Sequence, residues 1–130
     1  MNTDESKVTS KLFLAKNLNF TEGKLEKLEL FANQVLSFNK RYNLISKNSE
    51  KNIWHRHILD SAQLIKHIDY KNFKSLSDLG TGAGFPGIIL SIFYNDIRYF
   101  WHAGCMPDFK LSIFSLECRY FWHAGCMPDS

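Results

Sequence analysis

The sequence has 130 residues and a small positive charge, with 16 Lys and Arg against 13 Asp and Glu. This length is sufficient for one small domain, and no apolar run is long enough to span a membrane. Residues 1–5 contain no basic stretch leading into an apolar one, so the sequence predicts no signal peptide and a cytoplasmic location. Three cysteines are an odd number, and the cytosol would keep them reduced.

The first part of the chain has the apolar periodicity of helices. Leucines and a phenylalanine predict a short helix over residues 8–18. Thr21 is a residue type that caps helices, and the pattern after it predicts an amphipathic helix over residues 22–39. The apolar stripe of this second helix consists of Leu25, Leu28, Phe31, Ala32, Val35 and Phe38.

Two further helices are predicted before the first strand. They cover residues 49–58 and 61–68, with Ser49 as the cap of the first and Asp60 or Ser61 as the cap of the second. The four helices would pack together as a helical subdomain over residues 1–73.

Residues 74–97 have the order of a strand, a glycine loop and a helix. The sequence DLGTGAGFPG at residues 78–87 follows a hydrophilic approach and precedes an apolar run. Glycine has no Cβ, so such a loop can adopt positive φ and bring backbone N–H groups close to a ligand. Pro86 suits the first turn of the following helix, where its missing N–H costs nothing. The segment therefore predicts the site of a nucleotide-type cofactor, and the alternative is a structural turn in another kind of α/β protein.

The glycine spacing also distinguishes between cofactors. It departs from the dinucleotide fingerprint, which has glycine where Phe85 stands. The pattern Asp-x-Gly-x-Gly-x-Gly instead resembles the first motif of the S-adenosylmethionine-dependent methyltransferases, whose loop passes under the methionine part of the cofactor. By this resemblance the cofactor-binding residues are Asp78, Gly80, Thr81, Gly82, Gly84 and Phe85.

Two more motifs precede the loop, Tyr42-Asn43-Leu44 and RHILDS at residues 56–61. In order and spacing, residues 20–97 resemble the bacterial small-subunit ribosomal RNA methyltransferase G family, also called the glucose-inhibited division protein B family. One departure is Ala62, where the family more often has leucine. The resemblance implies a class I, Rossmann-like α/β fold and S-adenosylmethionine-dependent methylation of a guanine in small-subunit ribosomal RNA, at position seven of the base.

The resemblance also implies roles for residues outside the loop. It places His57 and Asp60 close to the cofactor pocket, although capping by Asp60 and packing by His57 are equally open and can coexist with that role. It makes Arg41, Asn43 and Arg56 candidates for the same pocket or for RNA contact. The guanine nitrogen already has a free lone pair and needs no general base, so alignment and exclusion of water would carry the reaction, and we name no catalytic residue.

Positive charge is concentrated in the helical part. Residues 1–75 hold 13 Lys and Arg against 8 Asp and Glu, whereas residues 76–130 hold 3 against 5. This distribution predicts contact with RNA phosphates, and the alternative is an ordinary solvated helical face. The densest group, flanked by His55 and His57, consists of Lys40, Arg41, Lys47, Lys51 and Arg56.

The resemblance ends near residue 97, and residues 98–130 are predicted to be an aberrant tail. The family pattern calls here for a second strand that ends in an acidic residue binding the ribose, but the nearby acids are Asp96, before that strand, and Asp108, after it. Residues 98–108 recur unchanged at 119–129, which indicates a recent duplication or inserted element. Later strands of the sheet have no counterpart, so the sequence predicts an incomplete cofactor site.

Three functions remain open on the sequence alone. The first is the S-adenosylmethionine-dependent enzyme, with small-subunit ribosomal RNA as its partner, no membrane partner and a monomeric state. The second is a non-catalytic remnant, at most a helical piece that contacts RNA. The third and weakest is a small zinc module made by the duplication, with the ligands His102, Cys105, His123 and Cys126.

Overall fold

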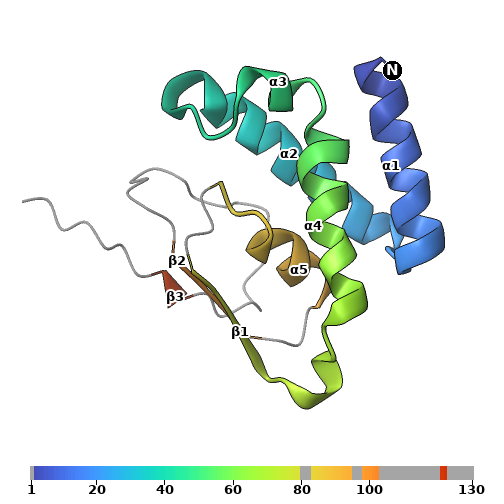
Figure 1. Cartoon of the computed structure of the whole chain (residues 1–130), viewed down its shortest axis with the longest axis vertical. Coiled ribbons are helices and arrows are strands. Elements are labelled where there is room, and N and C mark those ends of the chain that lie inside the picture. Colours follow the sequence, from blue (N-terminus) through green and yellow to red (C-terminus); the bar gives the residue numbers. More distant parts are fainter. Residues whose placement is uncertain (1, 80–82, 95–97, 103–120, 123–130) are drawn as a thin grey trace, which may run out of the picture.

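The fold combines a helical layer with a small parallel sheet (Figure 1). The computed structural model describes residues 2–79, 83–94, 98–102 and 121–122. Helices α1, α2 and the segment labelled α4 cross one another on one side, and β1 runs along the other side. Short helix α5 lies between them. In the described part of the chain, no helix is both long and apolar enough to cross a membrane.

Helix α1 (Thr3–Leu18) ends where the sequence predicts but begins five residues earlier than position 8. Its start has no apolar periodicity and is held by polar contacts instead. The Asn2 N–H donates to the Glu5 carboxylate at 3.3 Å, and Lys7 and Lys11 both pair with Glu29 of α2. Lys11 and then Lys7 lower the pKa of Glu29, although such partly exposed pairs contribute little to stability.

Helix α2 (Glu22–Tyr42) confirms the predicted amphipathic helix and extends it by three residues. The Thr21 hydroxyl accepts from the Lys24 N–H at 3.4 Å, as expected of an N-cap. Five of the six predicted stripe residues are buried, but Phe38 is only half-buried.

Asn39 takes the buried position at the end of that stripe, with an exposed fraction of 4%. Its side-chain N–H donates to Glu50 Oε1 at 2.6 Å, and its Oδ1 accepts from the Ile45 N–H at 2.8 Å. These bonds tie the turn after α2 and helix α3 (Lys47–Glu50) to the body of α2.

The prediction of two separate helices over residues 49–58 and 61–68 is wrong. The structure has one helical run over residues 54–67, made of a π-helical segment η1 (Trp54–Leu59), α4 (Asp60–Ala62) and a 3₁₀ segment η2 (Gln63–His67). Asp60 lies inside it with φ −60° and ψ −46°, so neither it nor Ser61 caps a helix. Ser46, not Ser49, caps the short helix before it, because the Ser46 hydroxyl accepts from the Ser49 N–H at 3.2 Å.

Packing explains why the 54–67 helix continues through residues that often begin helices. Trp54, Ile58 and Ala62 follow at four-residue steps and are all buried. Trp54 and Ile58 lie in η1, which packs against α1 and α2, and Ala62 lies in α4, which packs against α5. Interrupting the helix would expose this stripe. Tertiary burial therefore outweighs the local preference of Asp and Ser for caps.

The strand and the helix predicted within residues 74–97 are both present, whereas residues 80–82 and 95–97 lie outside the described part of the chain. A 3₁₀ turn η3 (Tyr70–Asn72) leads into β1 (Ser75–Leu79), and α5 (Gly87–Phe93) follows the loop. Strand β2 (Arg98–His102) pairs parallel with β1 from Ser75 beside Arg98 to Leu79 beside His102, and β3 (Phe121–Trp122) pairs parallel with β2. The order β1-α5-β2 is thus a parallel βαβ connection.

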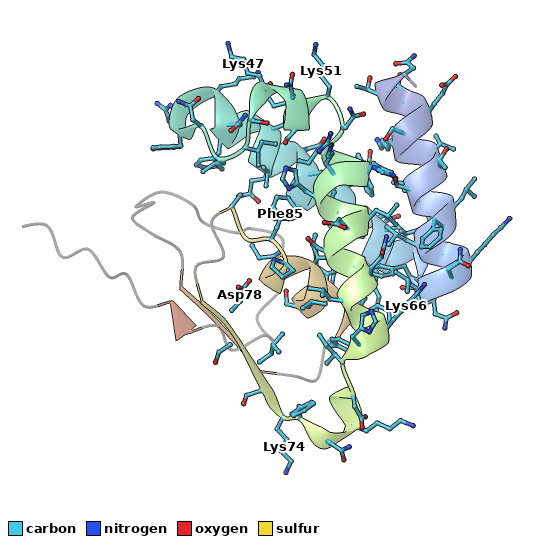
Figure 2. All side chains as sticks on the ribbon, in the orientation of Figure 1. Lys47, Lys51, Lys66, Lys74, Asp78 and Phe85 are labelled. Carbon is cyan, nitrogen blue, oxygen red and sulfur yellow. The ribbon has the colours of Figure 1, made fainter. Side chains whose placement is uncertain are left out.

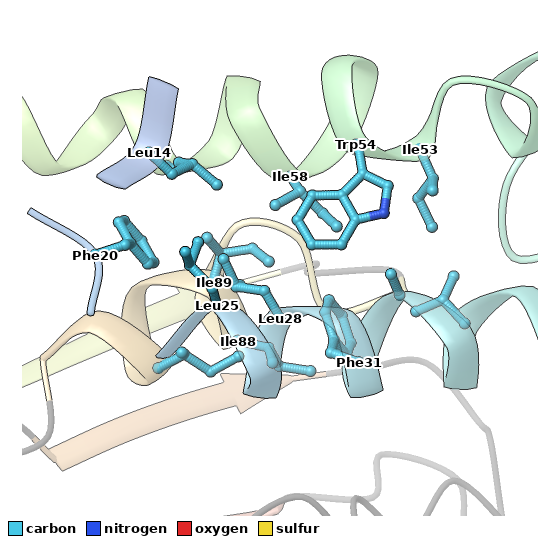
Figure 3. Packing of buried hydrophobic residues seen from close by; sticks show 14 of the residues in the cluster. Leu14, Phe20, Leu25, Leu28, Phe31, Ile53, Trp54, Ile58, Ile88 and Ile89 are labelled. Carbon is cyan, nitrogen blue, oxygen red and sulfur yellow. The ribbon is translucent and has the colours of Figure 1, made fainter. Parts of the chain in front are cut away.

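Helix α5 joins the sheet to the helical layer. Residues 87–92 are all buried, and its isoleucines enter the cluster formed by the helices. Figure 3 shows Ile88 and Ile89 from α5 among Leu14, Phe20, Leu25 and Leu28. At the end of α5, the Lys24 ammonium donates to the Phe93 carbonyl at 2.8 Å.

Candidate functional site

The glycine loop is closed by a bond between its two ends. Asp78, at the end of β1, accepts through Oδ2 from the Gly87 N–H at 2.8 Å. Gly87 begins α5, so the carboxylate also lies at a helix N-terminus, which favours negative charge. Figure 2 shows Asp78 beside β1 and Phe85 beside the helical layer.

At Gly84 and Gly87, near the start of α5, the surrounding atoms leave no room for a Cβ. A Cβ on Gly87 would lie 2.6 Å from Asp78 Oδ2 and would displace the carboxylate from the N–H that it accepts. Gly84 has φ +101°, and a Cβ there would lie 2.2 Å from Ile88 Cδ1. Both glycines therefore serve the fold of the loop. The other predicted loop residues, Gly80, Thr81 and Gly82, lie outside the described residues.

Phe85, a predicted cofactor residue, is half-buried and contacts two other aromatic side chains. The His57 ring stacks on it with centroids 4.9 Å apart and 25° between the ring planes. Phe31 of α2 contacts it with centroids 5.2 Å apart and a tilt of 58°. The structure thus brings the predicted His57 to the glycine loop. The sequence assigns Phe31 only to the core, since nothing in its local pattern indicates a partner so distant in the chain.

His57 is half-buried, and its Nε2 atom is buried without a hydrogen-bond partner in the described part of the chain. Burial lowers the pKa of this imidazole below its ordinary value of 6.5; Asp60 raises it and Arg56 lowers it further, both by smaller amounts. Burial therefore favours the neutral form of the ring. Arg56 and Asp60 themselves are exposed, so of these three predicted residues it is His57 that contacts the described part of the loop.

The remaining predicted residues lie around the end of α2. Asn43 adopts the left-handed conformation, with φ 48°, and its N–H donates to the Asn39 carbonyl at 3.3 Å, so its backbone terminates the helix. Arg41 and the Asn43 side chain are exposed.

The sequence around this turn carries a set of exposed basic side chains, which we call the basic surface. It consists of Lys40, Arg41, Lys47, Lys51 and Arg56. Among the described residues, no ion pair joins any of the five to an acidic side chain. Figure 2 shows Lys47 and Lys51 pointing outward from the α3 region, at the opposite end of the molecule from Lys74. Five unpaired cations could contact a polyanion.

The described residues contain no group of three or more His, Cys, Asp or Glu side chains that could hold a metal ion. The side chains of the zinc alternative, His102, Cys105, His123 and Cys126, lie outside the described ones. What the described arrangement offers chemically is a carboxylate, Asp78, bonded to the start of a helix at the end of a parallel strand, where open α/β sheets bind ligands.

Comparison with known proteins adds a family and two relatives. The sequence model of the family described as rRNA small subunit methyltransferase G matches residues 24–101. The ribosomal RNA small subunit methyltransferase G of Rickettsia bellii (strain OSU 85-389) is 59% identical over 68 residues, which are 52% of this chain and 35% of that protein. The protein of the same name from Rickettsia prowazekii (strain Madrid E) is 56% identical over the same shares. The match thus spans about a third of the length of these curated relatives.

Proposed function

The chain belongs to the rRNA small subunit methyltransferase G family, and from this membership we propose that it carries the cofactor loop and RNA-facing helices of an S-adenosylmethionine-dependent methyltransferase. The proposed target is a guanine of small-subunit ribosomal RNA, at position seven of the base. The fold proposed for the whole enzyme is the class I, Rossmann-like one. Residues 1–73 would be its helical subdomain, 74–97 its first strand, loop and helix, and 98–130 an aberrant tail with a 21-residue duplication, although the first residues of that tail form β2 beside β1.

The observation that carries this proposal is the bond from the Gly87 N–H to Asp78 Oδ2. It joins the end of β1 to the start of α5 at the carboxyl end of a parallel strand, where a nucleotide-type ligand would bind. Bound S-adenosylmethionine would supply an activated methyl group on a positively charged sulfur. This cofactor fits a loop whose backbone N–H groups would bind the carboxylate of the methionine part. An acidic residue, Asp78, stands at the entry of that loop.

The residues of this chain would act by binding and orientation. The loop from Asp78 to Phe85 would hold the methionine part of the cofactor, and the Phe85 ring with His57 would exclude water from one side of it. Since the accepting nitrogen needs no base, in-line positioning in a dry site is the main requirement.

The first test is a calorimetric titration of S-adenosylmethionine into the purified 130-residue chain. Binding at micromolar strength would mean that the tail or an oligomer completes the cofactor site, and it would support the enzyme function. Heat-denatured chain serves as the blank, and circular dichroism shows whether the titrated sample is folded. A folded sample that gives no heat would contradict the enzyme function and support the alternative, a non-catalytic remnant.

RNA contact is tested separately on the basic surface. We expect the paired substitution Lys47→Gln and Lys51→Gln to weaken binding of a short RNA hairpin, measured by fluorescence anisotropy over a range of salt concentrations. Each phosphate that the protein no longer neutralises should reduce the slope of log affinity against log salt by about 0.7 to 0.9, so the slope should fall by up to about two.

The matched control removes the same charge elsewhere. Lys71 and Lys74 are also exposed, and Lys74 lies at the other end of the molecule (Figure 2). The pair Lys71→Gln and Lys74→Gln should leave the salt slope nearly unchanged. Equal reductions in the two double variants would mean that RNA responds only to net charge, and would contradict a specific basic surface.

A further inference from the structure

Three aromatic rings from separate parts of the chain meet beside the glycine loop. His57 from the 54–67 helix stacks on Phe85 with centroids 4.9 Å apart, and Phe31 from α2 lies 5.2 Å from the same ring. Gly84, the residue before Phe85, has φ +101°. If it had a Cβ, that atom would lie 3.4 Å from Phe31 Cζ. The backbone at Gly84 therefore lies against the Phe31 ring.

We propose that His57 is a positioning residue for the glycine loop, which holds the Phe85 ring against α2 and thereby fixes the passage from Gly84 into α5. The bonds at stake are those made by the Gly87 N–H to Asp78 and by the Ile88 N–H to the Gly84 carbonyl, at 2.8 and 2.9 Å. Any effect of His57 on cofactor affinity rests on the proposed function. Its effect on the order of the loop does not rest on that function.

The chemistry of an imidazole gives this contact a dependence on pH that a purely aromatic contact would lack. Stacking requires the ring to remain partly out of water, and burial lowers the pKa of His57 below 6.5. The charged groups that act on it are Asp60, which opposes this shift, and Arg56, which adds to it. The loop contributes the uncharged Phe85 ring, which in turn contacts Phe31 of α2. From α1, the Lys11 ammonium lies over the Trp54 ring at 5.4 Å from its centroid.

The direction of this pH dependence follows from proton linkage. An opened loop hydrates the imidazole and returns its pKa toward 6.5, so between the lowered pKa and 6.5 the open state binds more protons. The contribution of His57 to the stability of the closed loop is therefore fully present above pH 6.5. It is lost as the pH falls from 6.5 through the lowered pKa of His57.

The test is amide hydrogen exchange followed by NMR on the full chain without cofactor. His57→Ala should speed exchange at Gly87 and Ile88 by three- to tenfold relative to amides in α2, as expected when one aromatic stacking interaction is removed. His57→Phe keeps a ring but no titrating group, so it should retain the slow exchange and remove its pH dependence between pH 5 and 7. In the parent chain, corrected protection at these two amides should fall as the pH drops below 6.5.

The controls separate positioning from general stability. His55→Ala, on the same helix but exposed, should leave both amides unchanged. The proposal is overturned if His57→Ala leaves them within twofold of the parent, if all amides accelerate equally, or if His57→Phe exchanges like His57→Ala. Because no cofactor is present, failure here is distinct from failure to bind S-adenosylmethionine.

Discussion

Gly84→Ala is expected to lower the free energy of unfolding by about 2 to 6 kcal/mol, the sum of backbone strain and steric overlap. At φ +101° an alanine is strained whatever space surrounds it. In addition, the new Cβ would lie 2.2 Å from Ile88 Cδ1, and Ile88 is only 1% exposed, so it has little room to move. Urea unfolding followed by circular dichroism measures the effect, and S-adenosylmethionine binding should disappear with it.

The variant Ile88→Val separates backbone strain from steric overlap as causes of the loss of stability. Ile88→Val removes Cδ1, the atom that the alanine would meet, at its own cost of about 0.5 to 1.5 kcal/mol. Adding Ile88→Val to Gly84→Ala should therefore cost less than the two single changes summed, because the overlap is relieved while the strain at φ +101° remains.

Gly23→Ala is the matched control for the same chemical change. Gly23 lies in the first turn of α2, and a Cβ there would meet nothing within 4 Å. Alanine should stabilise the chain by up to about 1 kcal/mol, because it loses less backbone entropy in a helix. A Gly84→Ala chain as stable as the parent would show that the loop does not need glycine at that position.

The sequence is sufficient to predict those elements whose signal is local. The stripe from Leu25 to Val35 has a helical period and a cap in Thr21, so α2 follows from periodicity alone. The order of strand, loop and helix around Gly84 follows from glycine chemistry and the apolar run after it.

Features decided by contacts between distant segments could not be predicted. Asp60 has the residue type of a cap, yet Trp54 and Ile58 are buried by α1 and α2 and keep the helix continuous through it. Similarly, the His57 and Phe85 rings meet because the 54–67 helix and α5 pack on the same core, which no spacing in the sequence indicates. The roles of Asp78 and Gly87 in one hydrogen bond also require the loop to be closed in space.

Leu28→Ala is expected to destabilise the chain by about 2 to 5 kcal/mol, because the Leu28 side chain is completely buried and a cavity would remain in its place. It belongs to the cluster that receives Ile88 and Ile89 from α5 (Figure 3). Poorer packing there should therefore also loosen the start of α5 and the bond between Asp78 and Gly87. Urea unfolding measures the first effect, and exchange of the Gly87 amide measures the second.

Leu30→Ala makes the identical substitution two positions along the same helix. Leu30 is 57% exposed, so its truncation removes little buried surface and should change stability by less than about 0.5 kcal/mol. Leu28→Met, which nearly conserves volume, should cost less than about 1.5 kcal/mol. If Leu28→Ala and Leu30→Ala were equally mild, the helical layer would not be the support of the glycine loop. If Leu28→Ala alone accelerates exchange at Gly87, the core of the helices is what keeps the bond between Asp78 and Gly87 closed.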